Sequence, residues 1–264
     1  MTAPVSKWGD LRVRIASAVA MLVIGGGMVW LGGAWFHAFA GLVIGAMIWE
    51  LVRMLTHDGR GTAIALGALS GAVIVALNYV PGLLVLPAIA AVVIAGAVAM
   101  RTARKSWLIY APMVLLAGYS LCWMRDGPGI VFLVWLLCVV IASDVAGYFA
   151  GRTIGGPKFW PAISPKKTWS GTVAGWIGAG LVGLCFVPVF TGILGTPANP
   201  LAVALFSMFV GFAAQMGDIA ESAIKRRAGV KDSSALIPGH GGLLDRFDAL
   251  IGASLVVLAL GLFA

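Results

Sequence analysis

The stretch that decides the fold is IVFLVWLLCVVIASDVAGYFAG, residues 130–151, in which Asp144 is the only charged side chain. A helix needs about 20 apolar residues to cross a hydrocarbon core of ~30 Å, and this stretch is long enough. Similar runs recur along the chain: 61% of its 264 residues are hydrophobic, 11% are charged and the mean hydropathy is +1.01. A soluble domain carries about a quarter charged residues, because it needs a wetted surface. The sequence therefore predicts an all-α polytopic membrane protein.

Charged residues, glycines and prolines divide the apolar sequence into nine candidate transmembrane helices. Eight spans are the alternative, because the break at Gly32 and Gly33 is weak and the run 62–100 can be divided differently. The nine candidates are 13–31, 33–55, 62–80, 82–100, 107–124, 128–151, 169–190, 200–224 and 243–264.

Glycine pairs with Gly-x-x-x-Gly spacing occur in several of these spans. Small residues at this spacing let helices approach closely in lipid, so we expect packing contacts there rather than a nucleotide loop. The pairs are Gly41/Gly45, Gly67/Gly71 and Gly171/Gly175.

The basic residues indicate the orientation. If all nine spans cross the membrane, every one of the 18 basic residues except Arg125 lies on one side. Loops rich in Lys and Arg stay in the cytoplasm, so we expect this face to be cytoplasmic, in the inner (plasma) membrane. A net charge of +8 suits anionic headgroups or phosphorylated substrates. The basic face contains Lys7, Arg12, Arg14, Arg53, Arg60, Arg101, Arg104, Lys105, Arg152, Lys158, Lys166, Lys167, Lys225, Arg226, Arg227, Lys231 and Arg246.

Two functional regions are predicted, residues 1–125 without a catalytic motif and residues 126–264 with the catalytic machinery. In the first region, Glu50 and Arg53 lie one helical turn apart near a helix end, which favours a pair of snorkelling side chains.

Asp144 opens the second region. A carboxylate inside a spanning helix costs a few kcal/mol, so it faces the bundle interior and has a partner or a task. Tyr148 and Arg152 follow on the same helical face, and a structural ion pair is the alternative interpretation.

Two groups of acidic residues flank one short loop near the C-terminus. Asp245 and Asp248 begin the last predicted helix. Carboxylates converging from two helix ends are the oxygen ligands that Mg²⁺ prefers, whereas an ion-pair network closing the bundle is the alternative. The first group occupies one helical stripe, formed by Asp218, Glu221, Ser222 and Lys225.

Two loops offer groups that can bind phosphate. The segment Ser164-Pro-Lys-Lys-Thr168-Trp169 carries two ammonium groups and two hydroxyls on a proline-stiffened turn. Gly241 and Gly242 present amides just before a helix N-terminus, where an anion can sit. His240 beside them is either a structural donor or a phosphate contact, and zinc is disfavoured because no second histidine is near.

The residues from 222 to 248 resemble the signature of the phosphatidate cytidylyltransferases, also called CDP-diacylglycerol synthases. That signature runs Ser-x-x-Lys-Arg, Lys-Asp, His-Gly-Gly and Asp-Arg-x-Asp. The segments 143–152 and 164–169 are also similar to the family, although Ser170 stands where the family usually has Glu. The signature is filled by Ser222, Lys225, Arg226, Lys231, Asp232, Pro238, His240, Gly241, Gly242, Asp245, Arg246 and Asp248.

The resemblance implies Mg²⁺-dependent transfer of the cytidylyl group from CTP to phosphatidate at a bilayer, without nucleic acid. It leaves open a second, monovalent cation and a homodimer. With it we expect Asp218 and Asp245 to hold the metal and Asp248 and Asp144 to be further ligands or to support them. The remaining expected site residues are catalytic Ser222, Lys225, Arg226, Lys231, Asp232, His240 and Arg246, and substrate-binding Tyr148, Ser164, Lys166, Lys167, Thr168, Gly241 and Gly242.

Two other classes of protein remain as alternatives. A CTP-dependent polyprenol-type kinase, or a CDP-lipid synthase acting on another lipid, would use similar groups. A transporter of an anionic solute or lipid would also place acids in the membrane, but it predicts inverted repeats, and residues 1–125 and 126–264 show none.

Overall fold

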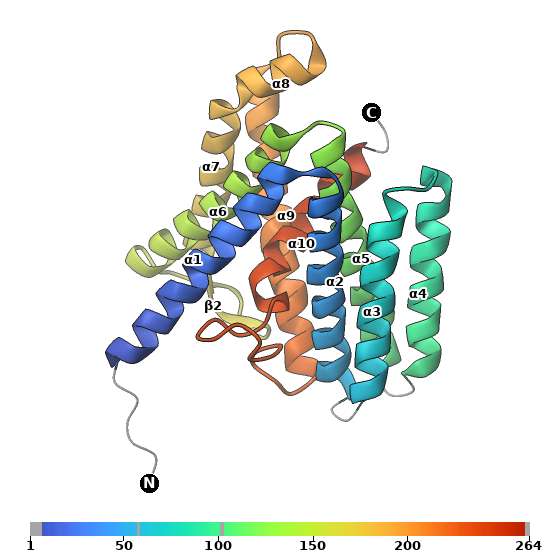
Figure 1. Cartoon of the computed structure of the whole chain (residues 1–264). Coiled ribbons are helices and arrows are strands. Elements are labelled where there is room, and N and C mark those ends of the chain that lie inside the picture. Colours follow the sequence, from blue (N-terminus) through green and yellow to red (C-terminus); the bar gives the residue numbers. More distant parts are fainter. Residues whose placement is uncertain (1–6, 57–58, 101–102, 262–264) are drawn as a thin grey trace. The chain divides into compact units, whose positions relative to one another are not determined.

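The computed structural model describes residues 7–56, 59–100 and 103–261, with side chains from residue 11 onward, and these residues are mostly helical (Figure 1). Each predicted span coincides with a helix, or with a pair of helices, to within a few residues. The side chain of Lys7, Arg101 and the last three residues of the predicted final span lie outside the described part. The helices are α1 Lys7–Leu31, α2 Gly33–Thr56, α3 Arg60–Leu77, the 3-10 turn η1 Gly82–Leu84, α4 Val85–Ala99, α5 Arg104–Asp126, α6 Ile130–Thr153, α7 Trp169–Cys185, α8 Val187–Leu194, α9 Pro200–Arg227 and α10 Leu244–Gly261.

Seven of the described helices are long and apolar enough to cross a membrane, and the pair α7 and α8 would make an eighth. Helix α10 is not among the seven, since it begins with Asp245, Arg246 and Asp248. The prediction of a helical polytopic membrane protein is therefore confirmed. The count of nine crossings and the cytoplasmic position of the loops stay predictions.

The predicted single span 169–190 is wrong in one respect, because its helix breaks after Cys185 and bends by 56°. Pro188 lies in the first turn of α8. Proline has no amide hydrogen, and its ring collides with the carbonyl four residues earlier, so it suits the start of a helix and interrupts its interior. The chain therefore begins a new helix at this point.

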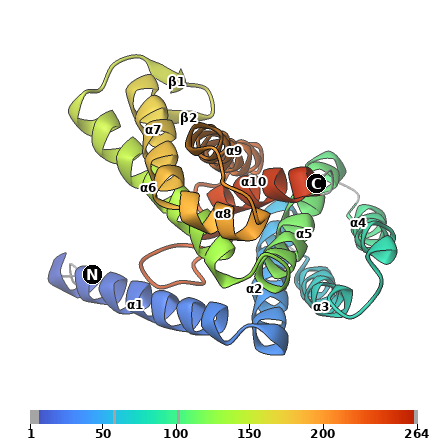
Figure 2. The ribbon, with the colours of Figure 1, turned by 90° about the horizontal axis from the view of Figure 1, so that it is seen from above.

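A short β-hairpin, which the sequence analysis did not predict, joins α6 to α7. Strand β1, Lys158–Trp160, pairs antiparallel with β2, Ser164–Thr168, and the register places Lys158 opposite Thr168. Figures 1 and 2 show α6 and α7 side by side, with the hairpin at one end of the pair. The hairpin carries the segment expected to form a phosphate-binding turn.

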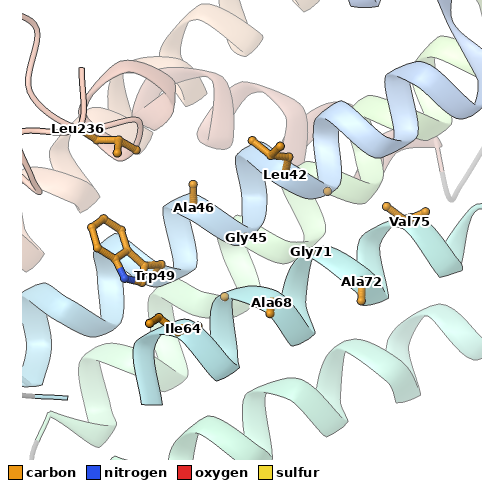
Figure 3. A pocket seen from close by; sticks show the side chains of 12 residues that line it. Leu42, Gly45, Ala46, Trp49, Ile64, Ala68, Gly71, Ala72, Val75 and Leu236 are labelled. Atoms are coloured by element: carbon orange, nitrogen blue, oxygen red, sulfur yellow. The ribbon is translucent and has the colours of Figure 1, made fainter. Parts of the chain in front are cut away.

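Met1–Ala111 and Ala228–Arg246 form the first of two compact units. In it α2 and α3 pack together through their glycines, as expected (Figure 3). A Cβ atom on Gly45 would lie 2.8 Å from the carbonyl oxygen of Gly67, so only glycine permits this approach. Trp49 and Ile64 line the shallow apolar groove that runs along the same pair of helices.

Pro112–Arg227 and Phe247–Ala264 form the second compact unit. Its apolar core surrounds Trp135, which is fully buried and stacks on Phe206 with 5.3 Å between ring centroids. The indole nitrogen of Trp135 donates a hydrogen bond to Ser207 Oγ at 3.0 Å, so the buried donor is satisfied. The expected packing of Gly171 is also confirmed, because a Cβ there would lie 2.5 Å from the carbonyl oxygen of Gly147 on α6.

Candidate functional site

Three carboxylates converge in the second unit. One carboxylate oxygen from each of Asp218 and Glu221 on α9 and Asp248 on α10 lies within 4.8 Å of the others. Helices α9 and α10 can approach this closely because of Gly217, whose Cβ would collide with the backbone of Asp248 and Gly252. Asp218 and Asp248 were predicted to be metal ligands, whereas Glu221 was not, although Glu221 lies one turn from Asp218 on the same stripe.

Two lysines neutralise part of this acidic cluster. Lys167 Nζ lies 2.5 Å from Asp218 Oδ2, and Lys225 Nζ lies 2.5 Å from Glu221 Oε2. Ser222 Oγ donates to Asp218 Oδ1 at 3.2 Å, which fixes the carboxylate from within α9. Carboxylates and ammonium groups therefore share a site in which a cation or a phosphate can replace one partner of each pair.

Helix α6 contributes Asp144 beside this cluster. Asp144 is not one of the three converging acids, but it is close enough to Asp248 for the two charges to repel each other. Four residues further along α6, the Tyr148 hydroxyl accepts a hydrogen bond from Arg152 at 2.8 Å, and the Tyr148 side chain is exposed. Of the predicted metal ligands, Asp144, Asp218 and Asp248 thus belong to one neighbourhood.

Alternation along β2 separates the side chains expected to clamp phosphate. Lys167 reaches Asp218, whereas the neighbouring Lys166 is exposed, because successive side chains on a strand point to opposite faces. Ser164, at the start of the strand, is partly buried opposite Trp160.

Thr168 performs a local structural task at the end of the hairpin. It is buried, and its hydroxyl caps α7 by accepting from Gly171 N at 3.2 Å. Ser170, which stands in the position of the family Glu, donates to the carbonyl of Gly155 at 2.5 Å. These contacts fix the hairpin to the start of α7.

The signature loop, residues 228–243, lies in the first unit. Asp245 accepts hydrogen bonds from Ser233 N at 2.9 Å, Ser233 Oγ at 3.0 Å and Gly242 N at 2.9 Å. The amide of Gly241 donates to the Ile237 carbonyl at 3.1 Å. The amides that were expected to bind an anion therefore donate hydrogen bonds within the loop and to Asp245. Direct contacts of Gly241 and Gly242 with substrate stay a prediction. The role of Asp245 as a metal ligand stays a prediction as well.

Glu50 corrects the prediction made for the first region. Its carboxylate is 0% exposed and accepts hydrogen bonds from residues of the signature loop and the start of α10, such as Leu244 N at 2.7 Å. Arg53 instead lies over the Trp49 ring, 5.6 Å from its centroid. The expected snorkelling pair is thus wrong, because the glutamate has better partners far away in the sequence.

A polar pocket of about 530 Å³ opens beside the signature loop. His240 Nδ1 lies 2.8 Å from Ser17 Oγ on α1, so the histidine has a structural partner at this edge of the pocket. Arg14, which the sequence analysis did not select, adds a guanidinium from the same helix. The polar lining includes Arg14, Lys231, Asp232, Ser234, His240 and Arg246. Arg226, the remaining predicted cation, is exposed in the last turn of α9.

Both the N-terminal and the C-terminal half of the chain are similar to proteins of one family. Residues 12–263 match the model of the cytidylyltransferase family. The chain is 34% identical over 262 residues to the phosphatidate cytidylyltransferase of Brucella suis, with 96% of this chain and 93% of that relative covered. It is 33% identical over 276 residues to the phosphatidate cytidylyltransferase of Pseudomonas aeruginosa, with 95% of this chain and 96% of that relative covered. The similarity therefore includes the N-terminal helices.

Proposed function

Because the chain belongs to the cytidylyltransferase family, we propose that it transfers the cytidylyl group of CTP to phosphatidate, forming CDP-diacylglycerol and pyrophosphate. The observation that carries this proposal is the convergence of Asp218, Glu221 and Asp248 within 4.8 Å, next to two lysines. Phosphoryl and nucleotidyl transfer depend mainly on positioning and on neutralising phosphate charge. The cluster brings together carboxylates, which can hold a cation, and ammonium groups, which can bind phosphate.

The acidic cluster fits a divalent cation of the Mg²⁺ type. Its three ligands are hard carboxylate oxygens, which Mg²⁺ prefers, and substrate phosphates and water commonly complete such a coordination shell. A bound divalent cation would stabilise the negative charge that develops on the triphosphate during transfer. Asp218, Glu221 and Asp248 would hold it, and Asp144 would add negative charge nearby. A second, monovalent cation, where one binds, would occupy the same group of acidic residues.

The protein's own cations address the repulsion between two phosphorylated substrates. An oxygen of the phosphatidate phosphate attacks the α-phosphorus of CTP, and the bond from that phosphorus to the β-phosphate oxygen breaks. The attacking oxygen is already anionic, so no strong general base is required. Lys167 and Lys225 stand at the acidic cluster, and Lys231 and Arg246 line the pocket of the signature loop, where each can bind phosphate oxygens.

The proposed location is the inner membrane, with the signature loop in the cytoplasm, where CTP is present. The long apolar helices support a location in the membrane, and the clustering of basic residues in one set of loops supports a cytoplasmic position for those loops. A protease added from either side of sealed vesicles tests this orientation, since only the cytoplasmic side should allow cleavage within 228–243. Measuring the mass of the purified protein in detergent tests the homodimer.

CTP labelled on its α-phosphate tests the proposed reaction with the purified full-length chain, phosphatidate and Mg²⁺. We expect the label in the lipid product and release of one pyrophosphate per product. Transfer of label from the γ-phosphate would instead identify a kinase. Flux of an anionic solute or lipid across proteoliposomes without CTP, together with no transfer, would identify a transporter.

A further inference from the structure

The carboxylate of Glu50 is completely buried in the first unit, on α2. Four donors converge on its two oxygens: Ser234 Oγ at 2.6 Å, Ser233 Oγ at 3.3 Å, Leu243 N at 2.9 Å and Leu244 N at 2.7 Å. A buried carboxylate is costly unless hydrogen bonds replace its hydration. These four contacts supply that replacement, and they all come from the segment 233–244.

The contacts with Leu243 and Leu244 occur at the start of α10. The first amides of a helix have no carbonyl partner within the helix, and the helix dipole makes this end positive. Glu50 therefore acts as a cap contributed by another helix. Asp245 accepts from the preceding amide, that of Gly242. Three consecutive amides, from 242 to 244, thus donate to carboxylates, two of them to Glu50.

The same carboxylate also contacts Ser233 and Ser234, ten residues earlier in the signature loop. Ser233 and Ser234 donate to Glu50, and Ser233 also donates to Asp245. Glu50 consequently holds the two ends of the segment 233–244 close to each other. A Cβ on Gly242 would lie 2.6 Å from Glu50 Oε1, so a larger residue at this position would require the carboxylate to shift.

The segment that Glu50 closes carries groups of the polar pocket. His240 lies between the two fixed ends, while Lys231 precedes the first and Arg246 follows the second. Glu50 is not part of the pocket lining. We infer that Glu50 is a positioning residue, which sets the pocket's cationic groups in place for substrate phosphate by holding both ends of the segment 233–244. This inference rests on the proposed function and adds a residue outside the signature to its site.

The steady-state kinetics of Glu50→Gln in the full-length protein test this role. The amide keeps the size of the side chain but presents NH₂ toward groups that are themselves donors. We expect KM for CTP or phosphatidate to rise on the order of tenfold, since charge-assisted hydrogen bonds are lost. Ser234→Ala, which removes one donor, should raise the same KM roughly twofold to fivefold. Arg53→Gln, one turn away on α2, is the matched control and should leave KM unchanged.

The split between KM and kcat separates positioning from a purely structural role. Loss of folded enzyme lowers the apparent kcat but leaves KM unchanged, because the remaining molecules bind substrate normally. Both KM values within about twofold of wild type in Glu50→Gln would therefore overturn the inference, whatever the unfolding temperature. If Glu50→Gln does not fold, Ser234→Ala decides instead, and KM values indistinguishable from wild type in that variant would overturn the inference.

Hydrogen–deuterium exchange keeps this inference separate from the proposed reaction. Faster exchange of the amides in 231–244 is expected in Glu50→Gln and not in Arg53→Gln. Unchanged exchange in that segment would contradict the positioning role even if the wild-type protein transfers no cytidylyl group. If the wild-type protein transfers no cytidylyl group but Glu50→Gln shows the expected faster exchange, only the proposed function is contradicted.

Discussion

Two buried glutamates, one in each compact unit, have opposite surroundings. Glu50 and Glu221 are both 0% exposed. Glu50 receives four hydrogen bonds from uncharged hydroxyl and amide groups. Glu221 instead pairs with the Lys225 ammonium and shares its surroundings with the carboxylates of Asp218 and Asp248.

This difference separates a carboxylate that holds structure from one that is available for chemistry. Amide and hydroxyl donors have fixed directions and belong to the backbone or to short side chains, so Glu50 determines where a loop lies. Like charges grouped together require cations, and cations can be exchanged for a metal ion or released to a phosphate. Burial alone would not distinguish the two residues, whereas the charge of their partners does.

The largest expected effect comes from removing one charge of the acidic cluster. Asp218→Asn should lower kcat by at least about 100-fold, because it weakens cation binding and leaves Lys167 without its carboxylate partner. Pyrophosphate release measures the activity, and thermal unfolding in detergent verifies the fold. Activity near wild type at saturating Mg²⁺ would remove Asp218 from the metal site.

The two glutamates should differ in how they affect the Mg²⁺ dependence. Glu221→Gln should raise the Mg²⁺ concentration for half-maximal activity on the order of tenfold. Glu50→Gln should leave this concentration within about twofold of wild type, because Glu50 accepts its hydrogen bonds from uncharged hydroxyl and amide donors. Mg²⁺ titrations at saturating CTP make the comparison, and equal shifts would abolish the distinction between the two sites.

Lys167→Ala tests whether the hairpin contributes to the acidic cluster. We expect kcat/KM to fall on the order of tenfold, since a charge-assisted contact with Asp218 and with phosphate is lost. Lys158→Ala is the control, because it removes the same charge from the other strand of the hairpin. Equal losses in the two variants would assign the effect to general electrostatics.

The smallest effect is expected at the exposed edge of the polar pocket. Arg14→Ala should raise KM for the phosphorylated substrates by about threefold to fivefold, as is typical of an exposed charge. Arg12→Ala removes the same charge from the same helix, two residues away and outside the pocket lining. A larger effect of Arg12→Ala would show that the pocket does not receive phosphate.

The helices could be predicted closely because apolar runs with glycine, proline or charge at their ends carry a local signal. The break at Pro188 was missed because the apolar run continues through the bend. The hairpin 158–168 was missed because its strands, of three and five residues, are too short to show an alternating pattern. In both cases the decisive feature is a backbone geometry that average composition does not record.

Within the site, local spacing predicted what lies on one helix. Asp218, Glu221, Ser222 and Lys225 were found from their common stripe on α9, but Glu221 was not chosen from that stripe as a metal ligand. The role of Glu50 could not be found in this way, because its partners lie 183 to 194 residues away. A glutamate one turn from an arginine favours a local pair until the distant donors are known.

The separation between Glu50 and its donors has a consequence for biosynthesis. At roughly 5–20 residues per second, a ribosome needs on the order of ten seconds or more to reach residues 233–244 after adding Glu50. Helix α2 must therefore enter the membrane with a carboxylate whose final partners do not yet exist. Until then only water or headgroups can solvate it, and a segment that is made late completes the environment of a helix that is made early.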